Sequence, residues 1–288
     1  MDTAHGLDPA GATCLVTGAN RGIGLAVSTA LARAGGQVTL LCRDPVRAEV
    51  ARDEIRRSTG TDHVDYLLAD LASQASIRSA ADEFRRRHDR LDVLVNNAAA
   101  VSEQRQTTVD GREFTFAVNH LAYFLLTRRL LDLVVAGRGV IVNLAATNHR
   151  DAIDDVEDLD SLDGYDMRAA YKRSKLANVS FTLELARRLG AAARVNSFCP
   201  GVNATELLMQ FRRVPPPLWA ERLAQESSPE AAAQVAMHLI TSPGTGRYLE
   251  EGVDVEPSPQ ARDPELAQRL WRQCSRLTGL DPSAVDPM

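Results

Sequence analysis

Tyr171 and Lys175 lie four residues apart in a segment with a helical apolar pattern, so both side chains share one helix face. An ammonium group beside a phenol stabilises the phenolate and lowers the pKa of the tyrosine towards working pH. Such a tyrosine can donate a proton to a carbonyl oxygen as hydride arrives, or accept one in the reverse direction. The same spacing also occurs by chance on surface helices, so its meaning depends on the rest of the chain.

A second group, Gly18, Gly22 and Gly24, follows the apolar run 13–17 and opens a helical pattern. Glycine allows a sharp turn and a close approach of backbone to phosphate, while a helix N-terminus offers free N–H groups. The spacing is G-x-x-x-G-x-G rather than the familiar G-x-G-x-x-G, and an ordinary strand-to-helix turn is the alternative. The preceding strand and the following helix favour a site for a dinucleotide pyrophosphate, and with the Tyr–Lys pair they suggest hydride transfer.

The end of the second expected strand bears on the choice of cofactor. An acid at this position would bind the ribose hydroxyls of NAD, but the residue is Cys42 and Arg43 follows it. With Arg21 in the glycine loop, two guanidinium groups suit a 2′-phosphate, so we predict NADP(H) over NAD(H). The alternative is that both arginines are simply solvated. Asp44 precedes Pro45, which suits a helix cap rather than the missing acid.

Apolar runs alternate with helical patterns along the whole chain. Strands are expected at residues 13–17, 38–42, 64–68, 91–95, 140–144, 194–198 and 246–249. Helices are expected at residues 23–34, 44–58, 73–88, 111–135, 171–189 and 229–240, the last with Ser228 as its N-cap. Continuous apolar strands between helices predict an α/β fold: a Rossmann-type, doubly wound parallel sheet of about seven strands with helices on both faces. We expect a single domain over residues 1–288, with residues 1–11 as an N-terminal tail.

The composition is that of an ordinary globular enzyme, with 44% hydrophobic and 25% charged residues. A net charge of −5 argues against nucleic acid or an anionic membrane as the main partner. The cysteines are scattered and predict reduced thiols: Cys14, Cys42, Cys199 and Cys274. We see no signal-peptide pattern and no apolar run near the roughly 20 residues of a membrane span, and expect a soluble, cytoplasmic protein.

These motifs together resemble the short-chain dehydrogenase/reductase family. Thr17–Gly24 matches its T-G-x-x-x-G-x-G motif, Asn96–Ala99 its N-N-A-G with Ala99 for glycine, and Tyr171 with Lys175 its Y-x-x-x-K. The resemblance extends from about Thr13 to Leu280. It implies cofactor contacts, for NADP(H), at Gly18, Asn20, Arg21, Gly22, Ile23, Gly24, Arg43, Asp70, Leu71, Asn97, Ala98, Ala99, Tyr171, Lys175, Pro200, Gly201, Val202 and Thr205.

The resemblance also implies roles in the reaction. Tyr171 is the acid/base, Lys175 lowers its pKa and holds the nicotinamide ribose, and Asn119 anchors a water that links Lys175 to solvent. Val118–Leu121, Ser174–Asn178 and the tail Leu266–Leu280 look like the retinol-dehydrogenase-like branch, whose membrane members carry an N-terminal anchor that we do not expect here. The substrate would be a hydrophobic small molecule under an apolar lid at residues 203–228, for which packing on the sheet edge is the alternative. Residues 243–288 form a C-terminal extension.

One departure from the family pattern bears on the chemistry. A serine hydroxyl usually ends the fifth strand and holds the substrate carbonyl oxygen, but here both serine positions are alanine, Ala145 and Ala146. Such a donor is worth about 3 kcal/mol at the barrier. Thr147 is one candidate to replace it. Alternatively, Tyr171 acts without it on a conjugated enone, or carbonyl reduction is lost and the protein is a non-redox isomerase, a cyclase or an NADP-binding sensor.

Three further features have competing interpretations. Asn148 and His149 are either pocket donors or part of a turn, and the turn is favoured. The acidic run 151–163 is expected to be a solvated loop rather than a metal site. The segment 171–189 has two apolar stripes, one with Leu176 and Val179 and one with Phe181 and Leu185. One of the two packs on the sheet, and the other is free to meet a second copy across a two-fold axis, although a monomer is also possible.

Overall fold

The computed structural model describes residues 6–152, 156, 158–161, 164–201, 209, 215–218 and 228–283. Within these residues, eight strands form one sheet in the order β3-β2-β1-β4-β5-β6-β7-β8. The strands are β1 (Thr13–Thr17), β2 (Gln37–Cys42), β3 (Val64–Leu68), β4 (Val93–Asn96), β5 (Val140–Leu144), β6 (Arg194–Cys199), β7 (Tyr248–Glu250) and β8 (Val253–Asp254). The expected Rossmann-type parallel sheet is confirmed, with one more strand than anticipated. The extra strand, β8, has two residues and runs antiparallel to β7, too short a segment to show a strand pattern in the sequence.

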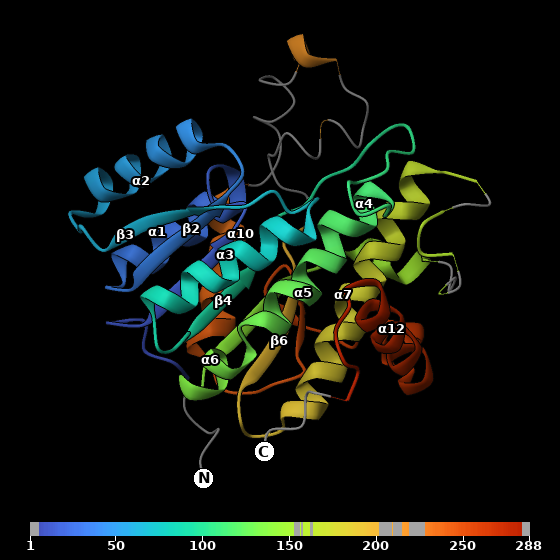
Figure 1. Ribbon diagram of the computed structural model, residues 1–288. Coiled ribbons are helices and arrows are strands. Elements are labelled where there is room, and N and C mark those ends of the chain that lie inside the picture. The colour runs from blue at the N-terminus through green and yellow to red at the C-terminus, as the bar shows by residue number, and fades with distance from the viewer. Residues whose placement is uncertain are drawn as a thin grey trace.

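Helices cover both faces of this sheet (Figure 1). They are α1 (Gly22–Arg33), α2 (Pro45–Thr59), α3 (Gln74–Arg87), α4 (Phe114–Phe116), α5 (Ala122–Arg129), α6 (Leu131–Ala136), α7 (Met167–Leu189), α10 (Pro229–Thr241), α11 (Pro259–Arg262) and α12 (Pro264–Leu277), with short helices η1 (Ala117–Leu121), η2 (Thr147–Asp151) and η3 (Pro216–Leu218). Successive side chains of a strand point to opposite faces. A hydrophobic core therefore lies on each face of the sheet. In β1, Leu15 packs in the core formed with α3, α5, α7 and α12, and Val16 packs in the core formed with α1, α2 and α10.

The order of the strands determines where a ligand can bind. From β1 the sheet grows through β2 and β3 on one side, and from β4 onwards on the other. The connections leaving the carboxyl ends of β1 and β4 therefore diverge and open a crevice. In open α/β sheets, ligands bind at this switch point.

Several helix ends follow the sequence signals. Asp44 caps α2, because its Oδ1 accepts hydrogen bonds from the backbone N–H groups of Val46 at 2.9 Å and Arg47 at 3.1 Å. Ser228 occupies the N-cap position of α10 and Pro229 begins the helix, as expected, although the Ser228 hydroxyl makes no capping hydrogen bond with the described residues. The helix of Tyr171 begins at Met167 rather than at the tyrosine itself. Tyr171 and Lys175 therefore lie inside a regular helix.

The single long helix expected over residues 111–135 is wrong. The segment is divided into α4, a π-helical turn η1, α5 and α6. The buried carboxylate of Glu113 starts α4 by accepting from the N–H groups of Thr115 and Phe116, each at 2.7 Å. In η1, the N–H of Ala122 donates to the carbonyl of Ala117, five residues earlier. An almost uniformly apolar sequence gives no sign of such a turn, which often occurs at functional sites.

The second apolar stripe of α7 is covered by the chain itself. The indole of Trp271 on α12 lies 6.0 Å from the ring of Phe181 on α7 and 5.1 Å from that of Phe124 on α5, between centroids. The guanidinium groups of Arg188 and Arg128 lie over the same indole at 4.2 and 4.8 Å. The expectation that this stripe is free for a partner is therefore wrong, because the C-terminal extension occupies it (Figure 1).

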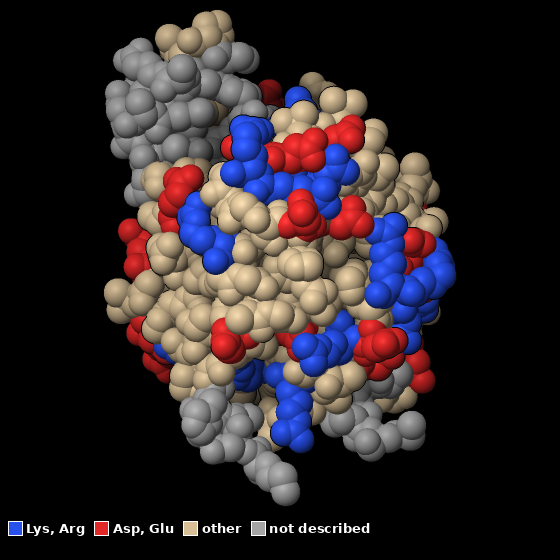
Figure 2. Space-filling model, turned by 90° about the vertical axis from the view of Figure 1, so that its left-hand side faces the viewer, with Lys and Arg blue, Asp and Glu red and all other residues tan. Residues whose placement is uncertain are grey.

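Charges of both signs alternate on the face formed by the β3 edge of the sheet. Figure 2 shows blue and red side chains interspersed around an area with few charges, and ion pairs such as Arg52–Glu49 at 3.0 Å and Arg87–Asp65 at 3.0 Å lie on it. This face therefore lacks, among the described residues, the continuous basic surface of nucleic-acid-binding proteins. None of the helices described here combines the length and apolar character needed to span a membrane.

From the covered stripe we propose that the protein is monomeric. Light scattering should give the monomer mass of 31.3 kDa. In Trp271→Ala, the loss of the buried indole should lower the free energy of unfolding by about 3–5 kcal/mol and uncover the stripe, so that self-association increases. The exposed Val109→Ala should change neither property. A stable dimer of the unmodified chain would contradict this prediction.

Candidate active site

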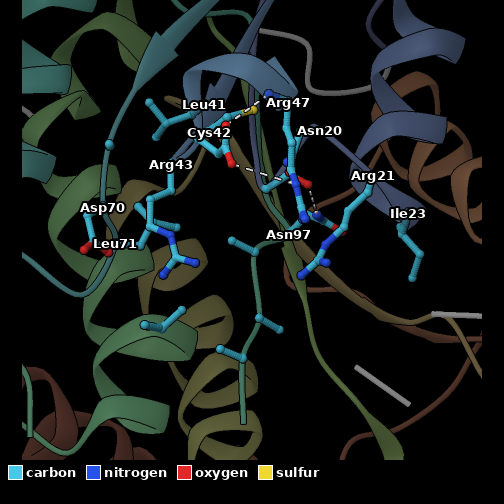
Figure 3. Close-up of a pocket in the computed structure, with 18 of the residues that line it drawn as sticks. Asn20, Arg21, Ile23, Leu41, Cys42, Arg43, Arg47, Asp70, Leu71 and Asn97 are labelled. Atoms are coloured by element: carbon cyan, nitrogen blue, oxygen red, sulfur yellow. Dashed lines mark hydrogen bonds and ion pairs between the residues drawn. The ribbon is translucent and has the colours of Figure 1, made fainter. Parts of the chain in front are cut away.

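A cavity of about 900 Å³ lies at the carboxyl ends of β1 to β5. Its walls come from the segments after the strands: Gly18 after β1, Asp70 after β3 and Asn97 after β4 (Figure 3). Of the residues expected to contact a cofactor, the cavity is lined by Gly18, Asn20, Arg21, Gly22, Ile23, Arg43, Asp70, Leu71, Asn97, Ala98 and Ala99. The pocket therefore lies at the switch point of the sheet, where the strand order predicts a binding site.

The glycines of the first loop are required by close packing. Gly18 has φ +64°, and a Cβ at this position would lie 2.9 Å from the Cα of Ala98. A Cβ on Gly24 would lie 2.3 Å from the carbonyl oxygen of Gly18 and 2.6 Å from Nδ2 of Asn97. Larger residues would push α1 away from the loop. The loop can therefore hold the helix N-terminus against the cavity, as phosphate binding requires.

Thr17 and Asn97 join the loops after β1 and β4. The hydroxyl of Thr17 accepts from the backbone N–H groups of Asn97 at 2.9 Å and Ala98 at 3.0 Å. In return, Nδ2 of Asn97 donates to the carbonyl of Thr17 at 3.0 Å. Tyr123 on α5 donates its hydroxyl hydrogen to the carbonyl of Ala98 at 2.8 Å. These bonds fix the positions of Asn97 and Ala98, which line the pocket.

Three arginines line one end of the cavity: Arg21, Arg43 and Arg47. Figure 3 shows Arg21 and Arg43 extending from different loops towards the same space, with Arg47 between them. Arg47 was missed in the sequence, although it follows Arg43 by four residues. Asp44 also lines this end, but its carboxylate is engaged as the cap of α2, and its Oδ2 lies 3.8 Å from Nε of Arg47. The dominant charge here is positive.

Tyr171 and Lys175 lie near the pocket without lining it, although both are among the described residues. The Lys175 ammonium is fully buried, lies 5.4 Å from the centroid of the Tyr171 ring, and donates to the carbonyl of Leu144 at 3.3 Å. Leu144 does line the pocket. Burial lowers the pKa of Lys175 to about 7, opposed by the nearby Cys199 thiol, and burial raises the pKa of Tyr171. The protein alone thus disfavours the charged form of both groups, so the expectation that Lys175 lowers the pKa of Tyr171 is wrong for the protein by itself, because burial dominates.

Asn119 lies in the π-helical turn and its side chain is hydrogen-bonded within the protein. Its Oδ1 accepts from the N–H of Ala100 at 2.7 Å, and its Nδ2 donates to the carbonyl of Ala100 at 3.0 Å and to the hydroxyl of Ser174 at 3.2 Å. Its backbone carbonyl accepts from Nδ2 of Asn178 at 3.0 Å. Ala100 lines the pocket, so Asn119 ties α7 to the pocket wall.

Ala146, where the resemblance to the family implies a serine, is buried two residues beyond β5, and its side chain is only a methyl group. The next residue, Thr147, has an exposed side chain, and its backbone N–H bonds to the thiol of Cys199. Cys199 is itself buried, which raises the pKa of its thiol. Thr147 therefore lies at the carboxyl end of the sheet with an exposed side chain.

His149 is a structural residue, as the turn interpretation expected, and it does not act as a pocket donor. Its ring is fully buried; Nε2 accepts from the N–H of Ser258 at 3.1 Å. Nδ1, 2.9 Å from the carbonyl of Ala146, is therefore the protonated nitrogen and donates to it. The imidazole joins the turn after β5 to the start of α11. Asn148 is half-buried in the same turn.

The remaining expectations concern the segment after β6. Gly201 has φ +73°, and a Cβ there would lie 2.8 Å from the side chain of Glu251. Val202, Thr205 and most of the expected lid 203–228 lie outside the described residues, as does part of the acidic run 151–163. Groups of three or more His, Cys, Asp or Glu able to hold a metal do not occur among the residues that are described.

A model of the short chain dehydrogenase family matches residues 12–215. The chain is 40% identical to retinol dehydrogenase 13 of Homo sapiens, over 96% of this chain and 87% of that protein. Among solved structures, it is similar to an uncharacterized protein from Mycobacterium Paratuberculosis, with a TM-score of 0.76, 28% identity and 98% of each chain covered. It is also similar to a Pseudomonas aeruginosa RhlG/NADP active-site complex, with a TM-score of 0.68, 25% identity, and 87% of this chain and 97% of that chain covered. The chain therefore belongs to the short-chain dehydrogenase family, in its retinol-dehydrogenase-like branch.

Proposed function

We propose that this protein is an NADPH-dependent reductase that acts on the carbonyl group of a hydrophobic small molecule. The observation that carries the proposal is the buried Lys175 ammonium, 5.4 Å from the centroid of the Tyr171 ring, beside a cavity rich in arginine. This arrangement combines a proton donor with a nucleotide-sized site. The oxidoreductase class follows from the family, while the cofactor and the residue roles are our proposals.

The pocket suits NADP(H) in its charge and in its shape. Gly18 and Gly24 leave no room for a Cβ, so the backbone at the start of α1 can approach a pyrophosphate closely. Arg21, Arg43 and Arg47 provide guanidinium groups for a 2′-phosphate, since bidentate bonds to phosphate oxygens are a preferred geometry of arginine. The similarity to the RhlG/NADP complex also supports this cofactor.

The side chains have distinct roles in the proposed reaction. NADPH, when bound, supplies the hydride. Tyr171 donates its hydroxyl proton to the substrate oxygen, and Lys175 in its ammonium form stabilises the phenolate left behind. The anionic cofactor would favour the charged form of Lys175, against the effect of burial. Asn119 holds α7 at the pocket wall through Ala100 and Ser174.

The name of the relative retinol dehydrogenase 13 supports a hydrophobic substrate for this chain. Phe114, Val118 and Leu144 contribute an apolar part to the wall of the pocket. All four cysteines are buried and free, which is consistent with a reducing compartment, and we propose a cytoplasmic location.

Ala146 favours a second candidate function. Without a hydroxyl at this position, the substrate oxygen would have Tyr171 as its principal donor, unless Thr147 turns inward. A conjugated enone, whose carbonyl needs less polarisation, suits such a site. A protein that binds NADP without reducing carbonyls, as a non-redox isomerase, a cyclase or a sensor, is the remaining alternative.

Arg43 provides a test of cofactor choice. Arg43→Ala should weaken NADPH binding by about 10- to 100-fold, because a charge-assisted contact to phosphate is lost, and should leave NADH binding nearly unchanged. Fluorescence titration of the reduced cofactors measures both affinities. Arg57→Ala is the matched control, since Arg57 is exposed on α2 and does not line the pocket. Equal affinity of the unmodified protein for NADH and NADPH would contradict the preference.

Tyr171 provides a test of the proposed reaction. Tyr171→Phe should lower kcat/KM for NADPH oxidation with ketones, aldehydes or enones by about 10²- to 10⁴-fold, because the proton donor is removed, while NADPH still binds. Tyr66→Phe, on the edge strand β3, serves as the control and should retain full activity.

Variants at the end of β5 separate the alternatives. A loss of about 10²-fold in Thr147→Ala would assign the missing donor to Thr147, whereas unchanged turnover would exclude it. If the unmodified protein reduces only enones, or nothing, and Ala146→Ser gains ketone reduction, the second candidate function is supported. Turnover that is unaffected by Tyr171→Phe would contradict the proposed mechanism.

A further inference from the structure

Asn178 is a buried amide on α7, three residues beyond Lys175, and it joins three parts of the site. Its side chain has no exposure to solvent. Nδ2 donates to the backbone carbonyl of Asn119 at 3.0 Å and to that of Leu144 at 3.1 Å. One amide thus links the π-helical turn, the end of β5 and α7.

The hydrogen-bond pattern fixes the orientation of this amide and the tautomer of its neighbour. Both N–H groups of Asn178 point to carbonyl oxygens, so its Oδ1 must accept from another group. Nδ1 of His120 lies 2.8 Å from this oxygen and must therefore carry a hydrogen. Burial lowers the pKa of His120 to about 4, so the imidazole is neutral near pH 7 with its proton on Nδ1.

The carbonyl of Leu144 is shared with Lys175. It accepts from Nδ2 of Asn178 and, at 3.3 Å, from Nζ of Lys175. A carbonyl oxygen has two lone pairs and can accept both bonds. A rigid acceptor is valuable here, because the ammonium is fully buried and depends on protein groups in place of water.

We propose that Asn178 and His120 are positioning residues for Lys175: His120 orients the amide of Asn178, which fixes the Leu144 carbonyl that holds the ammonium beside Tyr171. The inference rests on the proposed function, in which Lys175 assists Tyr171. It explains why a polar pair lies in a region of apolar side chains, at a π-helical turn.

Packing is the competing explanation for His120. Its ring lies 5.2 Å from that of Phe116 and 5.9 Å from that of Phe181, between centroids. Two substitutions separate the roles. His120→Phe keeps an aromatic ring and removes the donor, whereas His120→Asn removes the ring and keeps a donor close to the position of Nδ1.

The test measures the titration of Lys175 in the cofactor-free protein. The pKa of Lys175 is about 7 in the folded state, well below its ordinary value of 10.5, so above pH 7 the unfolded state binds more protons. Lys175 therefore makes the free energy of unfolding rise with pH from about 7, and Lys175→Met removes that rise. The free energy of unfolding is measured with urea across pH for each variant, once with Lys175 and once with Lys175→Met. The difference between the two curves isolates the titration of Lys175 from that of Tyr171 on α7, Cys199 on β6 and His120 on η1.

Loss of the fixed acceptor disfavours the ammonium, so in His120→Phe the rise should begin about one pH unit lower. In His120→Asn it should begin where it does in the unmodified protein. kcat/KM should fall about tenfold in His120→Phe and about twofold or less in His120→Asn, roughly the effect of one buried hydrogen bond. Ser180→Ala is the matched control, because the Ser180 hydroxyl is buried on the same helix and has no hydrogen-bond partner among the described residues.

The inference would be overturned if the pH at which the rise begins were unchanged in His120→Phe, or were lowered only in His120→Asn. Either result would leave His120 with a packing role. Asn178→Leu gives a second test, because it removes both donors and should lower the onset as His120→Phe does. The unfolding measurement requires neither cofactor nor substrate. A protein that fails to bind NADPH would therefore contradict the proposed function and still leave the positioning of Lys175 measurable.

Discussion

Burial of the Lys175 ammonium is the constraint on which the site depends. A charged group without water must find acceptors in the protein or lose its proton. Among the described residues, the acceptor is the carbonyl of Leu144 at the end of β5, and burial lowers the pKa of Lys175 to about 7. The group is therefore close to its titration point at neutral pH, so small changes in its surroundings decide its charge. In the proposed function, when Lys175 is charged it stabilises both a bound anionic cofactor and the phenolate of Tyr171, and when it is neutral it stabilises neither.

The cofactor end of the pocket is organised by a different kind of contact. Thr17 and Asn97 bond to each other's backbone, and the glycines at 18 and 24 let α1 approach them closely. None of these groups needs a ligand to satisfy it, so the loop should be preformed. In the proposed function, the choice between cofactors is left to the three arginines that line the other end of the pocket. The backbone contacts then fix the position of the site, and the charged side chains determine which cofactor is preferred.

The sequence predicts the fold well because its signals are local. Continuous apolar strands, Asp44 before Pro45 and the glycine turns each act within a few residues. The errors arise where distant residues decide. Helix 111–135 is interrupted where distant groups bond to it: the backbone N–H of Glu113 donates to Asp160, and the π-helical turn bonds to Asn178 through Asn119 and His120. The stripe at Phe181 is covered by Trp271, ninety residues later. Nothing in the sequence indicates a role for Asn178 beyond its place in a motif. Its hydrogen bonds go to the imidazole of His120 and to the carbonyls of Asn119 and Leu144, which lie on other elements.

The missing hydroxyl at Ala146 is best understood with the turn that follows it. His149 uses both ring nitrogens to join the Ala146 carbonyl to the backbone of Ser258, so this turn is stiffened by the C-terminal extension. Thr147 is the first residue of that turn, and its backbone is bonded to Cys199. A hydroxyl that must reach inward would have to do so by side-chain rotation alone, because the backbone is fixed on both sides. In the proposed reaction, the substrate oxygen would therefore be bonded either by Thr147 after a change of its side-chain rotamer or by Tyr171 alone.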